Sequence, residues 1–143
     1  MLRCKPCLDD DSLATLRRQE LDIPRDQAAE LCRSAVAAAA SGVYLSGTGR
    51  QVVWADTVRA AVAAKRSLPP DVPLPCDQPK TFPETVVQVT NETTLGAARR
   101  CVGAGMRPLA LNFANGVHPG GGFLSGARAQ EEVLCRSSAL CST

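Results

Sequence analysis

Apolar residues repeat with a helical period in the first third of the chain. Six of them follow the spacing i, i+3, i+4, i+7, i+8 and i+11, which places them on one face of a helix: Ala28, Leu31, Cys32, Ala35, Val36 and Ala39. Asp22 is a candidate N-cap for this helix, Pro24 suits its first turn, and Gly42 is a stop signal. Residues 43–55 then predict two short strands around a Ser-Gly-Thr-Gly turn, and a second helix is expected over about 56–66.

The pattern changes on both sides of this region. Residues 1–20 are charged and have no clean period, which indicates a leader that is either poorly ordered or helical. Residues 68–83 contain six prolines, which exclude a helix and most strand pairing. We interpret this proline-rich segment as an extended strap across one fold.

The second half predicts a strand, a helix and a further strand. Residues 85–90 are a short β-branched run, and Asn91 is a candidate cap for a helix that extends to about Ala104. Residues 108–114 form the next strand, whose apolar run without alternation is typical of a central parallel strand covered on both faces. The sequence therefore predicts an α/β fold in which this strand lies parallel to residues 85–89, with ligands at the carboxyl edge.

The composition and charge of the chain argue against several classes of protein. The chain has 143 residues, which suits one domain, and its net charge of +2 gives no argument for a nucleic-acid partner. No apolar stretch reaches about 18 residues and no signal core stands at the start, so we expect an intracellular, cytoplasmic protein without a membrane partner. The seven cysteines are odd in number and scattered, which predicts reduced thiols. Cys4 and Cys7 form one CxxC motif without a second ligand pair, and His118 is the only histidine, so we predict no metal and no cofactor.

Candidate chemistry gathers near the end of the chain. A triple glycine, 120–122, is separated by seven residues from the triplet Gln-Glu-Glu at 130–132. Such glycines let a ligand approach the backbone closely, and their N–H groups can form a nest for a diphosphate. The plain alternative is a flexible turn, because glycine is the default turn residue. For the acids, the plain alternative is a solvated helix on which Glu132 and Arg136 form an exposed i,i+4 ion pair.

The stretch "NFANGVHPGGGFLSGARAQEEVLCRSS" resembles the signature of poly(ADP-ribose) glycohydrolases, most closely their microbial type. In that family a GGG loop is followed at a similar short distance by QEE, and "LNFAN" resembles the strand-end motif of macrodomains. The resemblance is strong over residues 108–138 and weaker over 25–70. It implies a catalytic domain over 21–143: a helical and hairpin accessory region to about residue 83, then the start of an incomplete macrodomain-like sheet with flanking helices over about 84–143.

The resemblance implies an enzyme that hydrolyses ribose–ribose O-glycosidic bonds, acting on poly(ADP-ribose) or an ADP-ribosylated protein and releasing ADP-ribose. By position, Glu132 matches the family's catalytic acid/base and Glu131 the acid that holds ribose hydroxyls. The ligand-binding positions implied in the same way are Asn115, Gly120, Gly121, Gly122, Phe123 and Gln130. Such a bond needs a proton for the leaving oxygen and then a base for water, and one carboxyl group can serve both steps.

Only eleven residues follow Glu132, whereas the resemblance implies further βα units and a second phosphate-binding loop. We therefore expect the chain to be an amino-terminal part of such an enzyme, and its own activity stays open. One alternative is a module that binds ADP-ribose without cleaving it, which would not need Glu132. Another is an inactive homologue that acts through protein interaction, for which an unpaired strand edge would be suited.

Overall fold

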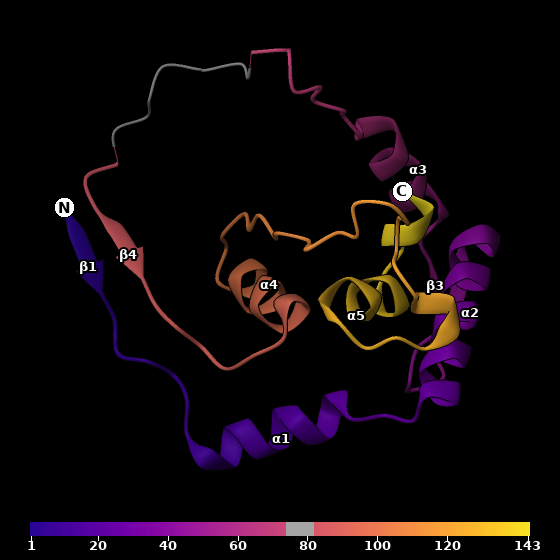
Figure 1. Cartoon of the computed structure of the whole chain (residues 1–143), viewed down its shortest axis with the longest axis horizontal. Helices are drawn as coiled ribbons and strands as arrows, with labels where there is room; N and C mark the ends of the chain where they lie inside the picture. Colours follow the sequence, from indigo (N-terminus) through magenta and orange to yellow (C-terminus); the bar gives the residue numbers. More distant parts are fainter. Residues whose placement is uncertain (74–81) are drawn as a thin grey trace.

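The structure, a computed structural model, describes residues 1–73 and 82–143. Within these residues it is a mixed α/β protein (Figure 1). Its helices are α1 (Asp11–Leu21), α2 (Arg25–Ser41), α3 (Ala55–Ala64), α4 (Thr94–Gly103) and α5 (Gln130–Ser137), with the 3₁₀ helices η1 (Phe123–Ser125) and η2 (Leu140–Ser142). Its strands are β1 (Leu2–Cys4), β2 (Val43–Leu45), β3 (Gln51–Val53) and β4 (Thr85–Val87). No helix of the described residues is both long enough and apolar enough to cross a membrane.

The helix and hairpin predicted for the first half are confirmed. α2 stops at Gly42, which adopts a left-handed backbone with φ 71°, and β2 and β3 then pair antiparallel. α3 follows close to its predicted place. Asp22 is not the N-cap of α2, because Pro24 occupies that position. Instead, Asp22 ends α1 and its carboxylate binds Arg128 at 2.7 Å.

The leader is helical in part, and the cap of α4 is a different residue from the predicted one. Residues 11–20 of the leader are helical, in agreement with one of the two alternatives. α4 is capped by Thr93, whose hydroxyl accepts from the N–H of Gly96 at 3.1 Å. Asn91, the predicted cap, donates instead to Asp9 at 2.8 Å. Half of the proline-rich strap, residues 74–81, lies outside the described residues.

The predicted central strand is wrong. β4 has a parallel partner, but that partner is β1, with Leu2 paired to Thr85, and residues 108–114 belong to no strand. The Gln130 side chain of α5 makes hydrogen bonds to this segment that a neighbouring strand would otherwise provide. Leu109 is fully exposed and Phe113 is 71% exposed, so the apolar run that predicted double-sided burial is not covered by the described residues.

The core lies where α2 packs against α5 and η1 (Figure 1). α2 contributes small side chains to it, which lets the helices approach closely: Ala28, Ala29, Cys32 and Ala39. Cys32 contacts the ring of Phe123 and the side chain of Cys135. Gly126 follows η1 with φ 79°, and any Cβ there would overlap the carbonyl of Arg25. A glycine is therefore required for the loop before α5 to lie against α2.

Candidate functional site

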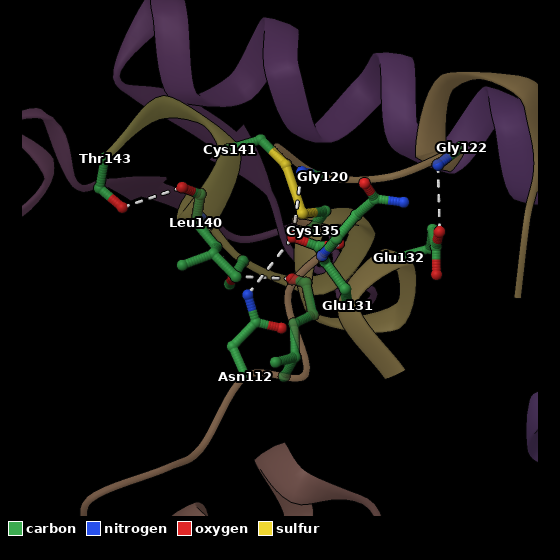
Figure 2. Close-up of a disulfide and its surroundings, with 12 residues drawn as sticks. Asn112, Gly120, Gly122, Glu131, Glu132, Cys135, Leu140, Cys141 and Thr143 are labelled. Carbon is green, nitrogen blue, oxygen red and sulfur yellow. Dashed lines mark hydrogen bonds between the residues drawn. A yellow bond between two sulfur atoms is a disulfide. The ribbon is translucent and has the colours of Figure 1, made fainter. Parts of the chain in front are cut away.

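α5 begins at the acid triplet that the sequence singles out. Glu131 and Glu132 lie in its first turn, where a carboxylate is favoured by the helix dipole. Both side chains are buried, at 5% and 7% exposure, and both face the glycine loop, which we define as residues 118–126 (Figure 2). The prediction that the two acids lie at the start of a helix beside this loop is confirmed.

Both carboxylate oxygens of Glu131 accept hydrogen bonds from backbone N–H groups. Oε2 accepts from Asn115 at 2.8 Å, and Oε1 accepts from Gly120 at 3.0 Å. The Asn115 N–H lowers the pKa of the Glu131 carboxyl below its usual value, and the Gly120 N–H acts in the same direction while burial opposes both. Glu131 thus ties the end of segment 108–115 to the glycine loop as a carboxylate.

Glu132 has a different environment. Its Oε1 accepts from the N–H of Gly122 at 3.0 Å, whereas Oε2 is buried and accepts no hydrogen bond from any described residue. The ion pair with Arg136 is not formed among the described residues, and the Arg136 guanidinium donates to the carbonyl of Ala127 at 3.4 Å. The description of the acids as a solvated helix face is therefore wrong for this structure.

The N–H groups of the three loop glycines donate to the acids or to a carbonyl of the loop, and they do not form an open anion nest. The N–H of Gly121 donates to the carbonyl of His118 at 2.8 Å, and the two flanking N–H groups donate to the carboxylates. Gly120 and Gly121 have φ of 81° and 56°. A Cβ at Gly121 would overlap Oε1 of Glu132, so the loop can only lie this close to the acids with glycine there. In this structure, the three N–H groups are not free to bind a diphosphate.

A cavity of about 650 Å³ lies on the Glu131 side of α5. It is lined by α3, by segment 112–115, by the glycine loop and by η2. Glu131 lines this cavity, but Glu132 points toward Gly122 and does not (Figure 2). The prediction that both acids reach one cleft is therefore met only by Glu131.

Gln130 acts as a substitute for a neighbouring strand. Its Oε1 accepts from the N–H of Phe113 at 2.8 Å, and its Nε2 donates to the carbonyl of Leu111 at 2.7 Å. The same Nε2 lies 3.3 Å from the hydroxyl of Thr94 at the start of α4. The side chain therefore fixes the segment from which Asn115 reaches Glu131, and its amide is fully engaged within the chain.

The remaining predicted residues lie nearby with roles in the framework. Asn115 lines the cavity, but its side-chain oxygen accepts from the N–H groups of Val117 and His118, both at 2.9 Å. Phe123 borders the cavity while its ring packs in the core.

Asn112 was not predicted from the sequence as a site residue. Its Nδ2 lies 3.5 Å from Oε1 of Glu131, and its Oδ1 is buried without a partner among the described residues. Its place in "LNFAN", ahead of Asn115, was the available signal.

The expectation of reduced thiols is wrong for one pair. Cys135 and Cys141 form a disulfide beside the cavity, whereas Cys4, Cys7, Cys32 and Cys101 are free thiols (Figure 2). The two cysteines are six positions apart in the sequence, and the turn between α5 and η2 brings them together. In residues 1–73 and 82–143, no three His, Cys, Asp or Glu side chains gather in a way that could hold a metal ion.

Comparisons with known proteins give one matching family model and one solved structure with a similar fold. A family model described as the catalytic domain of microbial-type PARG matches residues 32–143. The fold is similar to the crystal structure of poly(ADP-ribose) glycohydrolase (PARG) from Thermomonospora curvata, with 40% sequence identity and a TM-score of 0.69. The match covers 82% of this chain and 44% of that chain, so this chain spans less than half the length of its solved relative. A search of curated proteins finds no match.

Proposed function

The chain belongs to the family of microbial-type PARG catalytic domains, and from this premise we propose that it takes part in hydrolysing the ribose–ribose bonds of poly(ADP-ribose), which releases ADP-ribose. In the same way we assign residues 21–83 to an accessory region and 84–143 to the start of a macrodomain-like core. An ADP-ribosylated protein that carries the polymer is a substrate of the same chemistry.

The observation that carries this proposal is the unpaired oxygen of Glu132. Oε2 is buried and accepts no hydrogen bond from the described residues, next to an N–H donor that holds Oε1. A buried carboxyl oxygen without a partner costs free energy, so its persistence indicates a use other than stability. Glu132 is suited to protonate the leaving ribose oxygen and then to take a proton from water.

A substrate can reach Oε2 only if the glycine loop moves. Among the described residues, one hydrogen bond joins the loop to Glu132, from the N–H of Gly122, and glycines 120–122 carry no side chains that would hinder a change of backbone conformation. We propose that substrate takes the place of this hydrogen bond. In the moved loop, released N–H groups are then free to bind the diphosphate, in agreement with the family resemblance.

Glu131 has the second role in the proposal. It lines the cavity together with Asn115 and Phe123, and its carboxylate is an acceptor there for ribose hydroxyls. To bind a sugar, it must share its oxygens with the N–H groups of Asn115 and Gly120. Gln130, whose amide is occupied by segment 111–113, serves as a positioning residue in this scheme.

A module that binds ADP-ribose without cleaving it is the second candidate. The observation that favours it is that Glu131 lines the cavity while Glu132 does not. In this candidate the cavity binds the sugar in the present loop conformation, and Glu132 only holds the loop through Gly122.

The test compares this chain with a chimera in which it replaces the matching 44% of the Thermomonospora curvata enzyme. Release of ADP-ribose from poly(ADP-ribose) and equilibrium binding of ADP-ribose are measured for both. In the chimera, Glu132→Gln should lower turnover by about 10²–10⁴-fold with little change in binding, because Gln keeps the shape but cannot transfer the proton. Glu131→Gln should weaken both. Equal turnover of the Glu132→Gln chimera and its parent would refute the assignment of Glu132, and binding without turnover in the parent would favour the second candidate.

A further inference from the structure

The Cys135–Cys141 disulfide lies against the glycine loop and the cavity. Cys135 follows Glu131 by one helical turn, and both residues line the cavity together with Cys141. A Cβ built on Gly120 would lie 3.2 Å from Sγ of Cys141, so the disulfide contacts the residue whose N–H binds Glu131. Figure 2 shows the disulfide beside Gly120 and above Glu131.

The disulfide also holds the segment that closes one side of the cavity. Residues 138–143 turn back from the end of α5, and Leu140, Cys141 and Thr143 line the cavity. Apart from bonds within the segment, its hydrogen bonds to the described residues are one from the Ser138 hydroxyl to the Leu134 carbonyl at 2.7 Å and one from Lys65 to Thr143 at 2.8 Å. η2 also packs against α2 and α5, and the disulfide adds a covalent restraint to these contacts.

We propose that the Cys135–Cys141 disulfide is a thiol-controlled latch, which holds residues 138–143 over the Glu131 cavity when it is oxidised and lets them move away when a dithiol reduces it. The effect on ligand affinity rests on the proposed function of this cavity. The movement of the segment does not.

The two cysteine residues differ in exposure, which gives the exchange a direction. Cys141 is exposed, whereas Cys135 is 2% exposed. A thiolate of the dithiol therefore attacks Sγ of Cys141, forms a mixed disulfide and releases Cys135 as a thiolate, which takes up a proton. The second thiolate of the dithiol then attacks the reductant sulfur that is bonded to Sγ of Cys141. Cys141 leaves as a thiolate, and the reductant ends as an internal disulfide. Exchange with a small disulfide such as oxidised glutathione runs the two steps in reverse.

Cys32 does not compete in this exchange, although it belongs to the same core cluster as Cys135. It is completely buried, and burial raises the pKa of its thiol. A protonated thiol is a poor nucleophile, so Cys32 does not attack the disulfide. The latch therefore has two states, with Cys135 and Cys141 either joined or both free.

The experiment measures amide hydrogen exchange of the whole chain in two buffers, one with oxidised glutathione and one with the dithiol dithiothreitol, with alkylation and mass spectrometry to count thiols. Reduction should free the pair and speed exchange in residues 138–143 by about tenfold or more, with a smaller increase at Gly120. Cys141→Ser should show the fast pattern in both buffers. Cys101→Ser, which changes a free thiol outside the pair, should behave as the parent does. An unchanged exchange pattern on reduction, or a pair that is alkylated in the oxidised buffer, would overturn the latch.

A second readout separates the latch from the ligand. ADP-ribose should bind at least about tenfold more weakly to the oxidised parent than to the reduced parent and to Cys141→Ser, because the segment covers the cavity. Faster exchange on reduction without ADP-ribose binding in either state would retain the latch and reject the proposed ligand. Equal affinity of both states, with binding intact, would overturn the claim that the segment controls access.

Discussion

The close approach between Gly121 and Glu132 predicts a specific cost for one added methyl group. Gly121 has φ 56°, and a Cβ there would overlap Oε1 of Glu132. In Gly121→Ala, the left-handed backbone costs about 1–2 kcal/mol. The new methyl group also forces the Glu132 carboxylate or the loop to shift, which breaks the hydrogen bond from Gly122, and loss of a hydrogen bond to a charged group costs about 1.5–3 kcal/mol. The free energy of unfolding should therefore fall by about 2.5–5 kcal/mol in total.

A matched glycine isolates the contribution of the carboxylate. Gly49 has φ 76°, but a Cβ built on it meets no atom within 4 Å. Gly49→Ala should lose only the backbone contribution of about 1–2 kcal/mol. Urea unfolding of both variants measures the difference. Equal destabilisation of Gly121→Ala and Gly49→Ala would refute the contact between the loop and Glu132.

The acid itself provides the second half of the test. Combining Gly121→Ala with Glu132→Ala removes the atom that the new methyl group overlaps. The double variant should be more stable than the sum of the single effects by about 2 kcal/mol, as expected for residues in direct contact. Additive effects would show that Gly121 is destabilised by its backbone alone.

Three further predictions concern the framework of the site. Gln130→Leu should speed hydrogen exchange of the Phe113 amide and lower the free energy of unfolding by about 1 kcal/mol, because water replaces the lost bonds to this exposed segment. Because its folded pKa is lowered, Glu131 should stabilise the protein above the ordinary carboxyl pKa, and this contribution should disappear as pH falls through the folded value. Acid unfolding of Glu131→Gln should lack that component. Gly126→Ala should prevent cooperative thermal unfolding, since its methyl group would overlap the Arg25 carbonyl.

Local rules predicted the parts of the fold that depend on nearby residues. Gly42 ends α2 because a residue with a left-handed backbone is needed there, and this helix end can be predicted from the sequence alone. The hairpin follows from its turn, and the position of the acids follows from the spacing between the triple glycine and α5. The sequence predicted a glycine loop whose N–H groups bind a ligand, whereas in the structure these groups donate to the two acids and to the His118 carbonyl.

Features that depend on long-range competition could not be predicted. β1 pairs with β4 across more than eighty residues. No local pattern indicates that β4 pairs with β1 instead of with residues 108–114. The Gln130 side chain satisfies the backbone of that segment, and a sequence pattern does not distinguish this role from a ligand contact. The disulfide depends on the turn after α5, because two cysteines six residues apart meet only if the chain reverses direction.

The hydrogen bonds of the two acids explain why adjacent, chemically identical side chains suit different roles. Of their four carboxylate oxygens, three accept backbone N–H groups, from Asn115 and Gly120 on Glu131 and from Gly122 on Glu132. An oxygen held in this way is stabilised as an anion and is suited to bind hydroxyl groups, but it is a weak proton carrier. The fourth, Oε2 of Glu132, is buried and accepts no such bond from the described residues. The proposed division of roles follows this difference, because proton transfer is assigned to the one oxygen that no backbone N–H of the described residues holds.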